Sequence, residues 1–258
     1  LERGVKDDDG VRLYLGQLNE ERKRWDEARL WYETVDGPQA FSAKLRVAGV
    51  LARQGKLPEA RAYLQAMEVT TNQQRTQVVS AEATLLREAK QHQQAFEVLG
   101  KALEKLPNHP DLLYDYAMAA EKIDRLDVLE SSLKKLIQVK PDNAHAYNAL
   151  GYTLADRTTR FDEAKQYLEQ AIKLAPNDAF ILDSLGWLQY RMKEHAQAIS
   201  TLRRALSVRP DPEIAAHLGE VLWESGDKLE AKKVWDSALK DNPEHEALQT
   251  AIQKYKVR

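Results

Sequence analysis

Three eight-residue stretches in the second half of the chain decide its fold. Residues 164–171 read AKQYLEQA, residues 198–205 read AISTLRRA and residues 231–238 read AKKVWDSA. Each stretch has an alanine, a large residue four positions on and a second alanine three positions further, and a proline follows five residues later. A Leu-Gly pair lies upstream of each stretch, at residues 150–151, 185–186 and 218–219. The recurrence predicts an internal structural repeat.

The glycine of that pair defines a register that extends through the chain with a period of about 34 residues. The small residues at this position are Gly16, Ala48, Ala83, Ala117, Gly151, Gly186 and Gly219. The register predicts seven units that begin near residues 9, 41, 76, 110, 144, 179 and 212. Four units depart from the pattern: the first and second have Ala40 and Asn72 in place of the closing proline, Leu129 replaces the expected alanine of the fourth, and one extra residue lies near residues 157–160 in the fifth.

The composition favours helices. The 258 residues include only 11 Gly and 9 Pro, and Ala, Leu, Glu, Lys, Gln and Arg, the strongest helix formers, are abundant. No run of alternating β-branched residues competes, so we predict an all-α fold. We expect each unit to be a pair of helices that cross at the small residues. The proline ends the second helix because it lacks an N–H and disfavours helical geometry in the residue before it.

The pattern resembles the tetratricopeptide repeat, in which a Leu-Gly pair, an alanine and a closing proline recur every 34 residues. The resemblance covers residues 9–243 and implies a right-handed superhelix, or solenoid, of about seven helix-turn-helix repeats. Such repeats fold only when stacked. We interpret residues 1–8 as the remnant of an upstream segment. Residues 244–258 are predicted to form a C-terminal capping helix, because apolar residues recur there at helical spacing.

Charge and residue content argue against several classes of protein. The 38 Lys and Arg nearly balance the 40 Asp and Glu, so the chain lacks the basic excess of a nucleic-acid-binding protein. No apolar stretch is long enough to span a membrane. The chain has no cysteine, and its 6 histidines do not show the spacing of metal ligands. With no catalytic motif either, we predict a protein that is not an enzyme and that needs no cofactor or metal.

Function is therefore expected on a surface. The repeat resemblance implies that the first helices line a concave groove, with exposed side chains at about the second, fifth, ninth, twelfth and thirteenth positions of each repeat. We predict that this groove binds a protein or peptide partner, because aromatic residues and arginine dominate binding hot spots. The predicted partner-binding residues are Tyr114, Asn148, Tyr152, Phe180, Trp187, Tyr190, Arg191, His217 and Trp223.

Within this set, we expect Asn148 to bond a peptide backbone and Arg191 to pair with a carboxylate. An alternative remains open for the aromatic residues: one or two of them pack between neighbouring first helices instead of facing the groove. The same positions in repeats one to three hold few aromatic residues; they include Glu20, Leu45, Gly49, Arg53, Ser80 and Thr84.

A closer resemblance concerns the last repeats. Residues 183–191 and 213–223 look like the final repeats of proteobacterial outer-membrane tetratricopeptide repeat lipoproteins, a group that includes the adaptor of a periplasmic carboxyl-terminal processing protease. The likeness implies a location at the periplasmic face of the outer membrane, with a cytoplasmic location as the alternative. Two other functions stay open: a structural or assembly role through self-association, and binding of a cell-wall glycan. The oligomeric state is not predicted.

Overall fold

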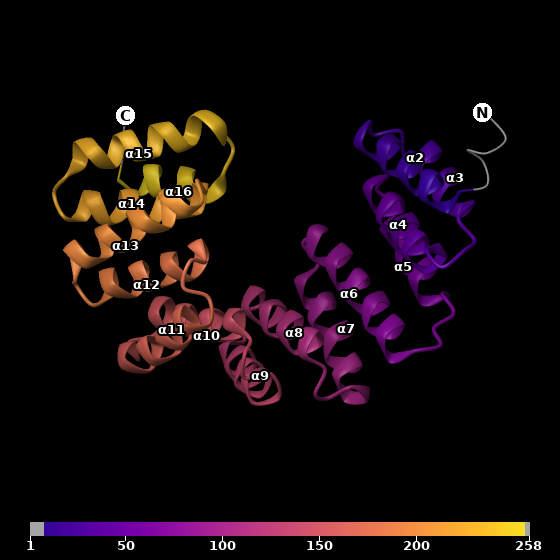
Figure 1. Ribbon diagram of the computed structural model, residues 1–258, viewed down its shortest axis with the longest axis horizontal. Helices are drawn as coiled ribbons and strands as arrows, with labels where there is room; N and C mark the ends of the chain where they lie inside the picture. The colour runs from indigo at the N-terminus through magenta and orange to yellow at the C-terminus, as the bar shows by residue number, and fades with distance from the viewer. Residues whose placement is uncertain (1–7, 256–258) are drawn as a thin grey trace. The chain divides into compact units, whose positions relative to one another are not determined.

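The computed structural model describes residues 8–255, and this part of the chain is entirely helical, with fifteen α-helices and no β-strand (Figure 1). The helices of the N-terminal half are α2 (Asp9–Glu21), α3 (Trp25–Glu33), α4 (Ala40–Arg53), α5 (Leu57–Gln65), α6 (Asn72–Glu88), α7 (His92–Lys105) and α8 (Pro110–Lys122). The helices that follow are α9 (Leu126–Val139), α10 (Ala144–Arg157), α11 (Phe161–Leu174), α12 (Ala179–Arg191), α13 (His195–Val208), α14 (Pro212–Glu224), α15 (Lys228–Asp241) and α16 (Glu246–Lys254).

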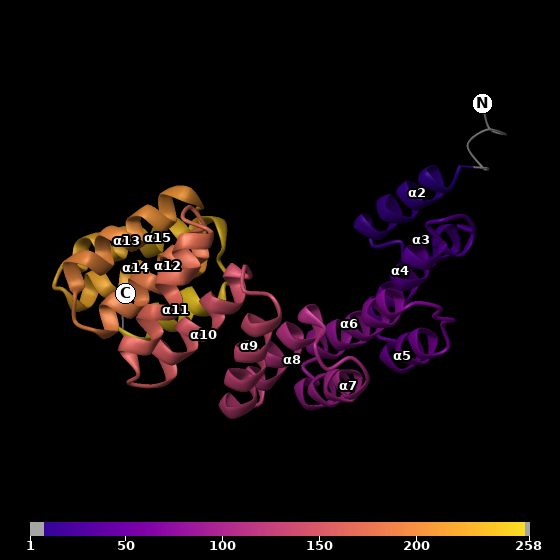
Figure 2. The same ribbon diagram turned by 60° about the horizontal axis from the view of Figure 1, so that its bottom comes forward.

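The chain divides into two compact units, and the division falls inside α9. The first unit ends at Leu129 and the second begins at Glu130. In both views of the molecule α12 to α16 form one closely packed group within the second unit (Figures 1 and 2). Each unit is described by itself below.

Within each unit the helices pack as successive hairpins. In the second unit α10 packs on α11, α12 on α13 and α14 on α15. The even-numbered helices, called first helices here, also pack on one another, with α12 between α10 and α14. The first unit repeats the arrangement, with α4 packed on α5 and α6 on α7, and with α6 between α4 and α8. Side chains of the first helices are therefore brought together across neighbouring repeats.

Helix starts follow the sequence register with one clear exception. The register places the third repeat near residue 76, but α6 begins at Asn72. Local capping explains the extra turn. The side chain of Thr71 accepts a hydrogen bond from the backbone N–H of Gln74 at 3.1 Å, and the Gln74 side chain in turn accepts one from the N–H of Thr70. These contacts satisfy backbone groups that a helix start leaves without partners.

The described residues cover only part of the two predicted end segments. Residues 1–7 of the predicted upstream remnant lie outside the described residues, whereas Asp8 caps α2 by accepting a hydrogen bond from the N–H of Gly10 at 2.8 Å. At the other end α16 packs on α14 and α15 and buries Leu248 and Ala251. Residues 256–258 of the predicted capping helix lie outside the described residues.

The repeat pattern reflects close packing between the two helices of a hairpin. A Cβ atom added to Gly219 on α14 would lie 2.0 Å from Nε1 of Trp235, the large residue of α15. At the equivalent place in the fifth repeat, a Cβ on Gly151 would lie 2.6 Å from Cγ of Leu168. Glycine at these positions therefore lets a large buried side chain lie directly against the backbone of the facing helix.

The turn inside most hairpins also recurs at one repeat position. Lys23, Lys90, Asp124 and Lys193 have φ angles between 57° and 68°, in the left-handed region. The same turn position is occupied by Gly55 and Gly226, whose φ angles are 78° and 98°. Most residues adopt this geometry only at a cost. The turn is therefore set by helix packing more than by the residue that occupies it.

Candidate functional site: the concave helices of the second unit

The predicted binding residues of the second unit come from three consecutive first helices. Asn148 and Tyr152 lie on α10, four residues (Phe180, Trp187, Tyr190 and Arg191) lie on α12, and His217 and Trp223 lie on α14. Because α12 packs between α10 and α14, these residues belong to one continuous helix layer. Tyr114 lies on α8 of the first unit, where burial raises the pKa of its hydroxyl.

Asp183 and His217 join α12 to α14. Nδ1 of His217 donates to the Asp183 carboxylate and lies 2.9 Å from each of its oxygens. Burial, the largest influence, lowers the pKa of His217, but attraction to the Asp183 carboxylate and the hydrogen bond with it raise that pKa by more. The net pKa lies above the ordinary histidine value of 6.5, so the pair has the character of a buried ion pair.

Trp187 extends this connection to α10. Its ring stacks on the His217 ring, with centroids 4.4 Å apart, and its Nε1 donates to Oδ1 of Asp156 at 3.0 Å. The residue is only 9% exposed. The prediction that Trp187 faces the groove is therefore wrong, and the alternative of packing between neighbouring first helices is realised at this residue. Asp183 and His217 lie in the same buried layer, so His217 is a structural residue of this layer.

Arg191 is held by the same residue of α10. Its Nη1 donates to the backbone carbonyl of Asp156 and lies 3.7 Å from the Asp156 carboxylate, and its guanidinium lies 5.8 Å from the ring centre of Phe161. The side chain is 30% exposed. In the predicted pairing, the other N–H groups of the guanidinium would donate to a carboxylate of the partner.

The other aromatic residues remain accessible to different degrees. Phe180 is 38% exposed, with the guanidinium of Arg209 5.0 Å from its ring centre. Tyr152 and Tyr190 are half-buried, and Tyr190 packs against Trp187 with ring centroids 5.1 Å apart. Burial raises the pKa of the Tyr190 hydroxyl. These three residues, Tyr152, Phe180 and Tyr190, form what we call the aromatic row.

Trp223 belongs to a different cluster. Its ring lies 5.8 Å from that of Trp235 and 5.6 Å from that of Tyr255, and Nζ of Lys228 lies 5.2 Å from its centre. Burial, followed by a hydrogen bond with Glu224, raises the pKa of Tyr255. Trp223 therefore packs mainly against Trp235 and Tyr255 near the C-terminus.

Asn148 presents only part of its amide. Its Oδ1 atom is enclosed and has no hydrogen-bond partner within residues 8–255. A partner backbone would therefore meet the amide nitrogen, which donates to a carbonyl oxygen.

Comparison with known proteins agrees with the repeat architecture. One family profile described as tetratricopeptide repeat matches residues 157–217, and a second with the same description matches residues 33–74 and 130–179. The chain belongs to the tetratricopeptide repeat family. Proteins of this family are generally protein-interaction scaffolds. No helix within residues 8–255 has both the length and the apolar character needed to cross a bilayer.

Individual relatives and solved structures differ in how much of their own length the chain matches. It is 41% identical over 213 residues, 82% of its length, to the TPR repeat-containing protein PA4667 of Pseudomonas aeruginosa. The chain spans only 36% of the length of that protein. A tetratricopeptide repeat protein structure from Parabacteroides merdae superposes with a TM-score of 0.71 at 14% identity, covering 95% of this chain and 97% of that one. The structure of YrrB superposes with a TM-score of 0.51 at 19% identity, covering 68% and 89%. At these identities the two superpositions show the fold alone.

The first unit has a hollow at groove positions that the sequence analysis named in repeats one to three but did not assign to partner binding. A hollow of about 440 Å³ is lined by first helices α2, α4 and α6 of this tetratricopeptide repeat chain. The buried carboxylate of Glu20 accepts hydrogen bonds from Arg53 at 2.7 Å and from the Tyr32 hydroxyl at 2.7 Å, and Arg46 lies 3.5 Å from it. Burial and this carboxylate raise the pKa of Tyr32. The sequence does show an acid and an arginine at adjacent groove positions of consecutive repeats, Glu20 at the twelfth and Arg53 at the thirteenth.

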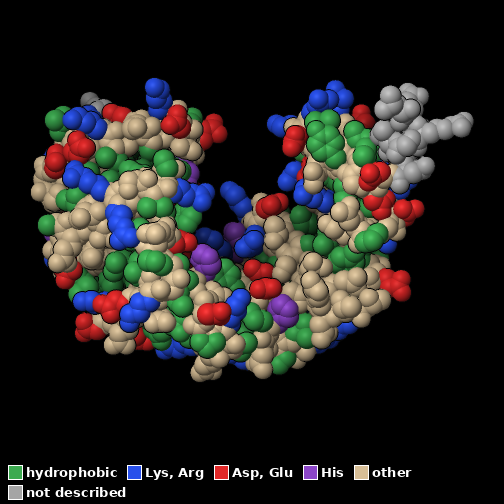
Figure 3. All heavy atoms as spheres, viewed as in Figure 1, with side chains coloured by type: hydrophobic (Ala, Val, Ile, Leu, Met, Phe, Trp, Pro, Cys, Tyr) green, Lys and Arg blue, Asp and Glu red, His purple; other side chains and the backbone are tan. Residues whose placement is uncertain are grey.

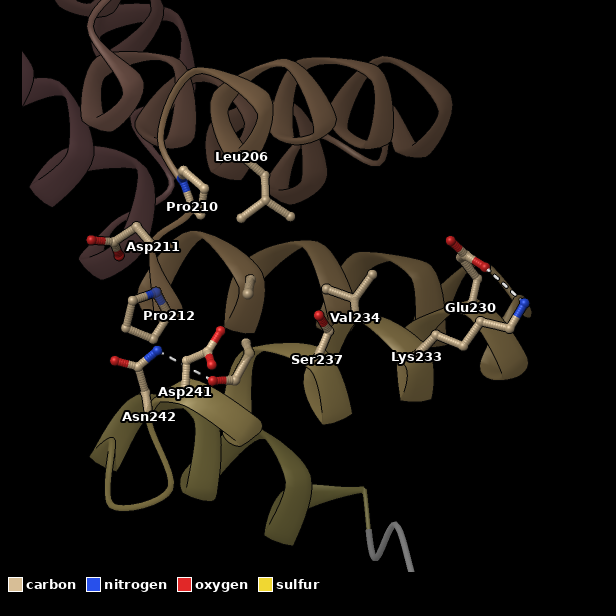
Figure 4. Close-up of a pocket in the computed structure, with 12 residues that line it drawn as sticks. Leu206, Pro210, Asp211, Pro212, Glu230, Lys233, Val234, Ser237, Asp241 and Asn242 are labelled. Carbon is tan, nitrogen blue, oxygen red and sulfur yellow. Dashed lines mark hydrogen bonds and ion pairs between the residues drawn. The ribbon is translucent and has the colours of Figure 1, made fainter.

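Further hollows lie beside the second helices, where no predicted site residue is found. In the second unit a hollow of about 440 Å³ lies between α13, the start of α14 and α15 (Figure 4). Apolar side chains, including Leu206, Pro210 and Val234, line it. Charged residues stand beside them, and Glu230 and Lys233 pair at 3.5 Å. A hollow of about 430 Å³ lies in the first unit beside α5, α6 and α7. The repeat pattern gave no signal for either, because it describes core residues.

Proposed function

We propose that the chain is a non-catalytic scaffold whose second unit binds a segment of a partner protein across α10 and α12. The observation that carries the proposal is the aromatic row: Tyr152, Phe180 and Tyr190 keep part of their rings accessible on consecutive first helices. Aromatic rings supply large contact area at a low entropic cost and dominate binding hot spots.

The layer beneath the row is well suited to hold it in place. Asp156, Trp187, His217 and Asp183 connect the three first helices by hydrogen bonds and ring stacking. A surface whose supporting side chains are already fixed loses little conformational entropy when a partner binds. Trp187 and His217, which the sequence analysis assigned to partner contact, thus support the aromatic row instead of contacting the partner.

The chemistry of the surface favours a partner segment held mainly by apolar contact. Figure 3 shows acidic and basic side chains interspersed over the visible faces of both units. Arg191 and the amide of Asn148 offer hydrogen-bond donors next to the aromatic row, for a carboxylate and a backbone carbonyl of the segment. The description of YrrB as a TPR protein with an unusual peptide-binding site supports peptide binding by this kind of fold.

We further propose that the protein acts at the periplasmic face of the outer membrane as a lipoprotein and presents substrates to a carboxyl-terminal processing protease. This part rests on the likeness of residues 183–191 and 213–223 to the lipoprotein family. Fractionation of source cells with an antibody against the chain tests the location. Recovery in the outer-membrane fraction, accessible to protease only after the outer membrane is permeabilised, is expected; recovery in the cytoplasm contradicts it.

Binding by the aromatic row is tested by affinity capture from an extract of the source cells. The double variant Tyr152→Ala and Phe180→Ala removes two rings of the row and keeps both Asp183 and His217. Because the Tyr152 ring lies 6.3 Å from the His217 ring, centroid to centroid, circular dichroism and thermal unfolding of the variant are measured alongside capture. Tyr14→Ala is the matched control, because Tyr14 is 62% exposed on α2 of the first unit. We expect quantitative mass spectrometry to find at least one protein that wild type and control retain and the double variant loses. Identical capture by all three proteins, with unchanged circular dichroism, contradicts the proposal.

A further inference from the structure

The hollow beside α5, α6 and α7 has an unusual charge balance. Four cationic residues line it, namely Arg61, Arg75, Lys101 and Lys105, against the single carboxylate of Glu82. The lining thus carries a net charge of +3 (four positive, one negative) in a chain whose total is −2. We call it the basic hollow. Its volume of about 430 Å³ is in the range of ligand pockets, about 300–1,000 Å³.

A buried carboxylate fixes one wall of the basic hollow. Glu82 occupies the repeat position that holds leucine in the Leu-Gly pairs of the later repeats, and it is buried. Its Oε1 accepts hydrogen bonds from Nε of Arg61 at 2.9 Å and from the Gln65 side chain at 2.8 Å. Replacing a core leucine with a charged residue does not by itself stabilise a fold, since desolvation offsets the gain from pairing. The pair does hold the Arg61 guanidinium at the wall of the hollow.

The other three cations are not neutralised within the described residues. Arg75, Lys101 and Lys105 form no ion pair with any residue in 8–255. The remaining acids of the three helices, Glu59, Glu88, Glu97 and Glu104, do not line the hollow. Between the cations lie the apolar side chains of Val79, Val98 and Ala102. The surface therefore combines an apolar patch with an unbalanced positive rim.

The second unit provides an internal comparison. When the third and seventh repeats are aligned on Ala95 and Ala231, the hollow of Figure 4 occupies the same place in the repeat. The apolar positions match, but Arg75, Lys101 and Lys105 are replaced by Asp211, Ser237 and Asp241. With Glu230 and Lys233, that lining has a net charge of −2 (three negative, one positive). The hollow is thus a consequence of repeat packing, and its positive charge is not shared by the seventh repeat.

We propose that the basic hollow is a docking site for an acidic segment of a partner protein. An apolar side chain of the segment contacts Val79, Val98 and Ala102. Carboxylates on either side of it pair with Arg75, Lys101 and Lys105. A hollow with an apolar floor favours a polypeptide over a lipid surface, because a flat headgroup layer does not fill it. The proposed site shares no residue with the aromatic row.

The test measures binding of a fluorescein-labelled synthetic peptide, a leucine flanked on both sides by glutamates, to the full chain by fluorescence anisotropy. The variant Lys101→Ser and Lys105→Asp introduces the residues of the seventh repeat at two exposed helix positions, away from the Glu82–Arg61 pair. Lys165→Ser and Lys173→Asp is the matched control, because it changes the net charge equally at exposed positions of α11. A peptide with glutamine in place of glutamate tests the need for charge.

We expect the acidic peptide to bind wild type and control equally and the hollow variant about three- to tenfold more weakly. Binding should weaken with added salt, since screening acts on exposed ion pairs, and the glutamine peptide should not bind. Equal loss in both variants, or no binding of the acidic peptide, overturns the proposal. Phosphatidylglycerol vesicles form a further arm: lysine-dependent binding to vesicles without binding to the peptide also overturns it. The Tyr152→Ala and Phe180→Ala variant should bind the peptide like wild type, which separates this result from the proposed function.

Discussion

Nδ1 of His217 on α14 lies 2.9 Å from both carboxylate oxygens of Asp183 on α12, and the two residues connect the first helices of consecutive repeats. The Trp187 ring covers the histidine and continues the connection to Asp156 on α10. Three repeats are thereby joined through polar contacts inside the layer that supports the aromatic row. The stability of this layer and binding on its surface can be tested separately.

The Asp183–His217 pair makes stability depend on pH. The folded pKa of His217 lies above its ordinary value of 6.5, so folding favours the protonated form. This contribution is complete below about pH 6.5, the unfolded value, and is lost as pH rises through the higher folded pKa. We expect the free energy of unfolding, measured in urea, to fall across that window. An NMR titration should give His217 a pKa above 6.5, and Asp183→Asn should lower it. A pKa at or below 6.5 in wild type contradicts the assignment.

Removing the indole donor of Trp187 should weaken the layer. Trp187→Phe keeps a ring beside His217 but deletes the hydrogen bond from Nε1 to Asp156. We expect a loss of about 1 kcal/mol in the free energy of unfolding. Phe180→Ala, on the same helix but exposed, should change stability less. Equal stability of Trp187→Phe and wild type would show that this hydrogen bond contributes nothing.

Close packing at the hairpin crossings predicts opposite effects for two glycines. Gly219→Ala places a Cβ atom 2.0 Å from Nε1 of Trp235, so it should destabilise the protein by about 1–3 kcal/mol. Gly49 on α4 has nothing within 4 Å of an added Cβ. Gly49→Ala should therefore stabilise it by about 0.5–1 kcal/mol through helix propensity alone. Thermal unfolding followed by circular dichroism checks both, and the same sign for both substitutions would contradict the packing explanation.

The recurring left-handed turn position predicts a stabilising substitution. Lys90 has φ of 57°, and its side chain is exposed. Lys90→Gly should raise the free energy of unfolding by about 0.5–1 kcal/mol, because glycine adopts this conformation without a steric penalty. The reverse change, Gly55→Lys, has open space around the new side chain and should destabilise through the backbone alone. A fall in melting temperature for Lys90→Gly would show that the lysine is not strained.

The repeat pattern predicted the helical hairpins because it records helix crossings directly. The pairing of Gly219 with Trp235 is visible as a small residue and a large residue at fixed spacing, and it needs no knowledge of distant contacts. Which side chains are exposed on the groove was less predictable from the sequence. Trp187 occupies a position that is exposed in an idealised repeat, but its ring is covered because His217 and Asp156 on both neighbouring helices offer it partners. A register that treats each repeat alone does not contain that information.

The positive charge of the basic hollow was not predicted from the sequence, for a related reason. Glu82 at a leucine position is a departure that the sequence displays, but its meaning depends on Arg61, which belongs to the preceding repeat. The helix start at Asn72 depends in the same way on side chains, those of Thr71 and Gln74, that lie outside the repeat pattern. Periodicity thus predicts the scaffold, and the individual departures from it mark where the surface chemistry lies.

Site-specific photocrosslinking tests the central claim most directly. A photoreactive phenylalanine analogue replaces Tyr152 or Phe180 in the aromatic row, and Tyr14 or the 71% exposed Leu229 as controls. After irradiation in source cells, we predict that the same partner protein is crosslinked from Tyr152 and Phe180 and not from Tyr14 or Leu229. Equal crosslinking from all four positions, or none from the aromatic row, would contradict a partner-binding surface on the first helices of the second unit.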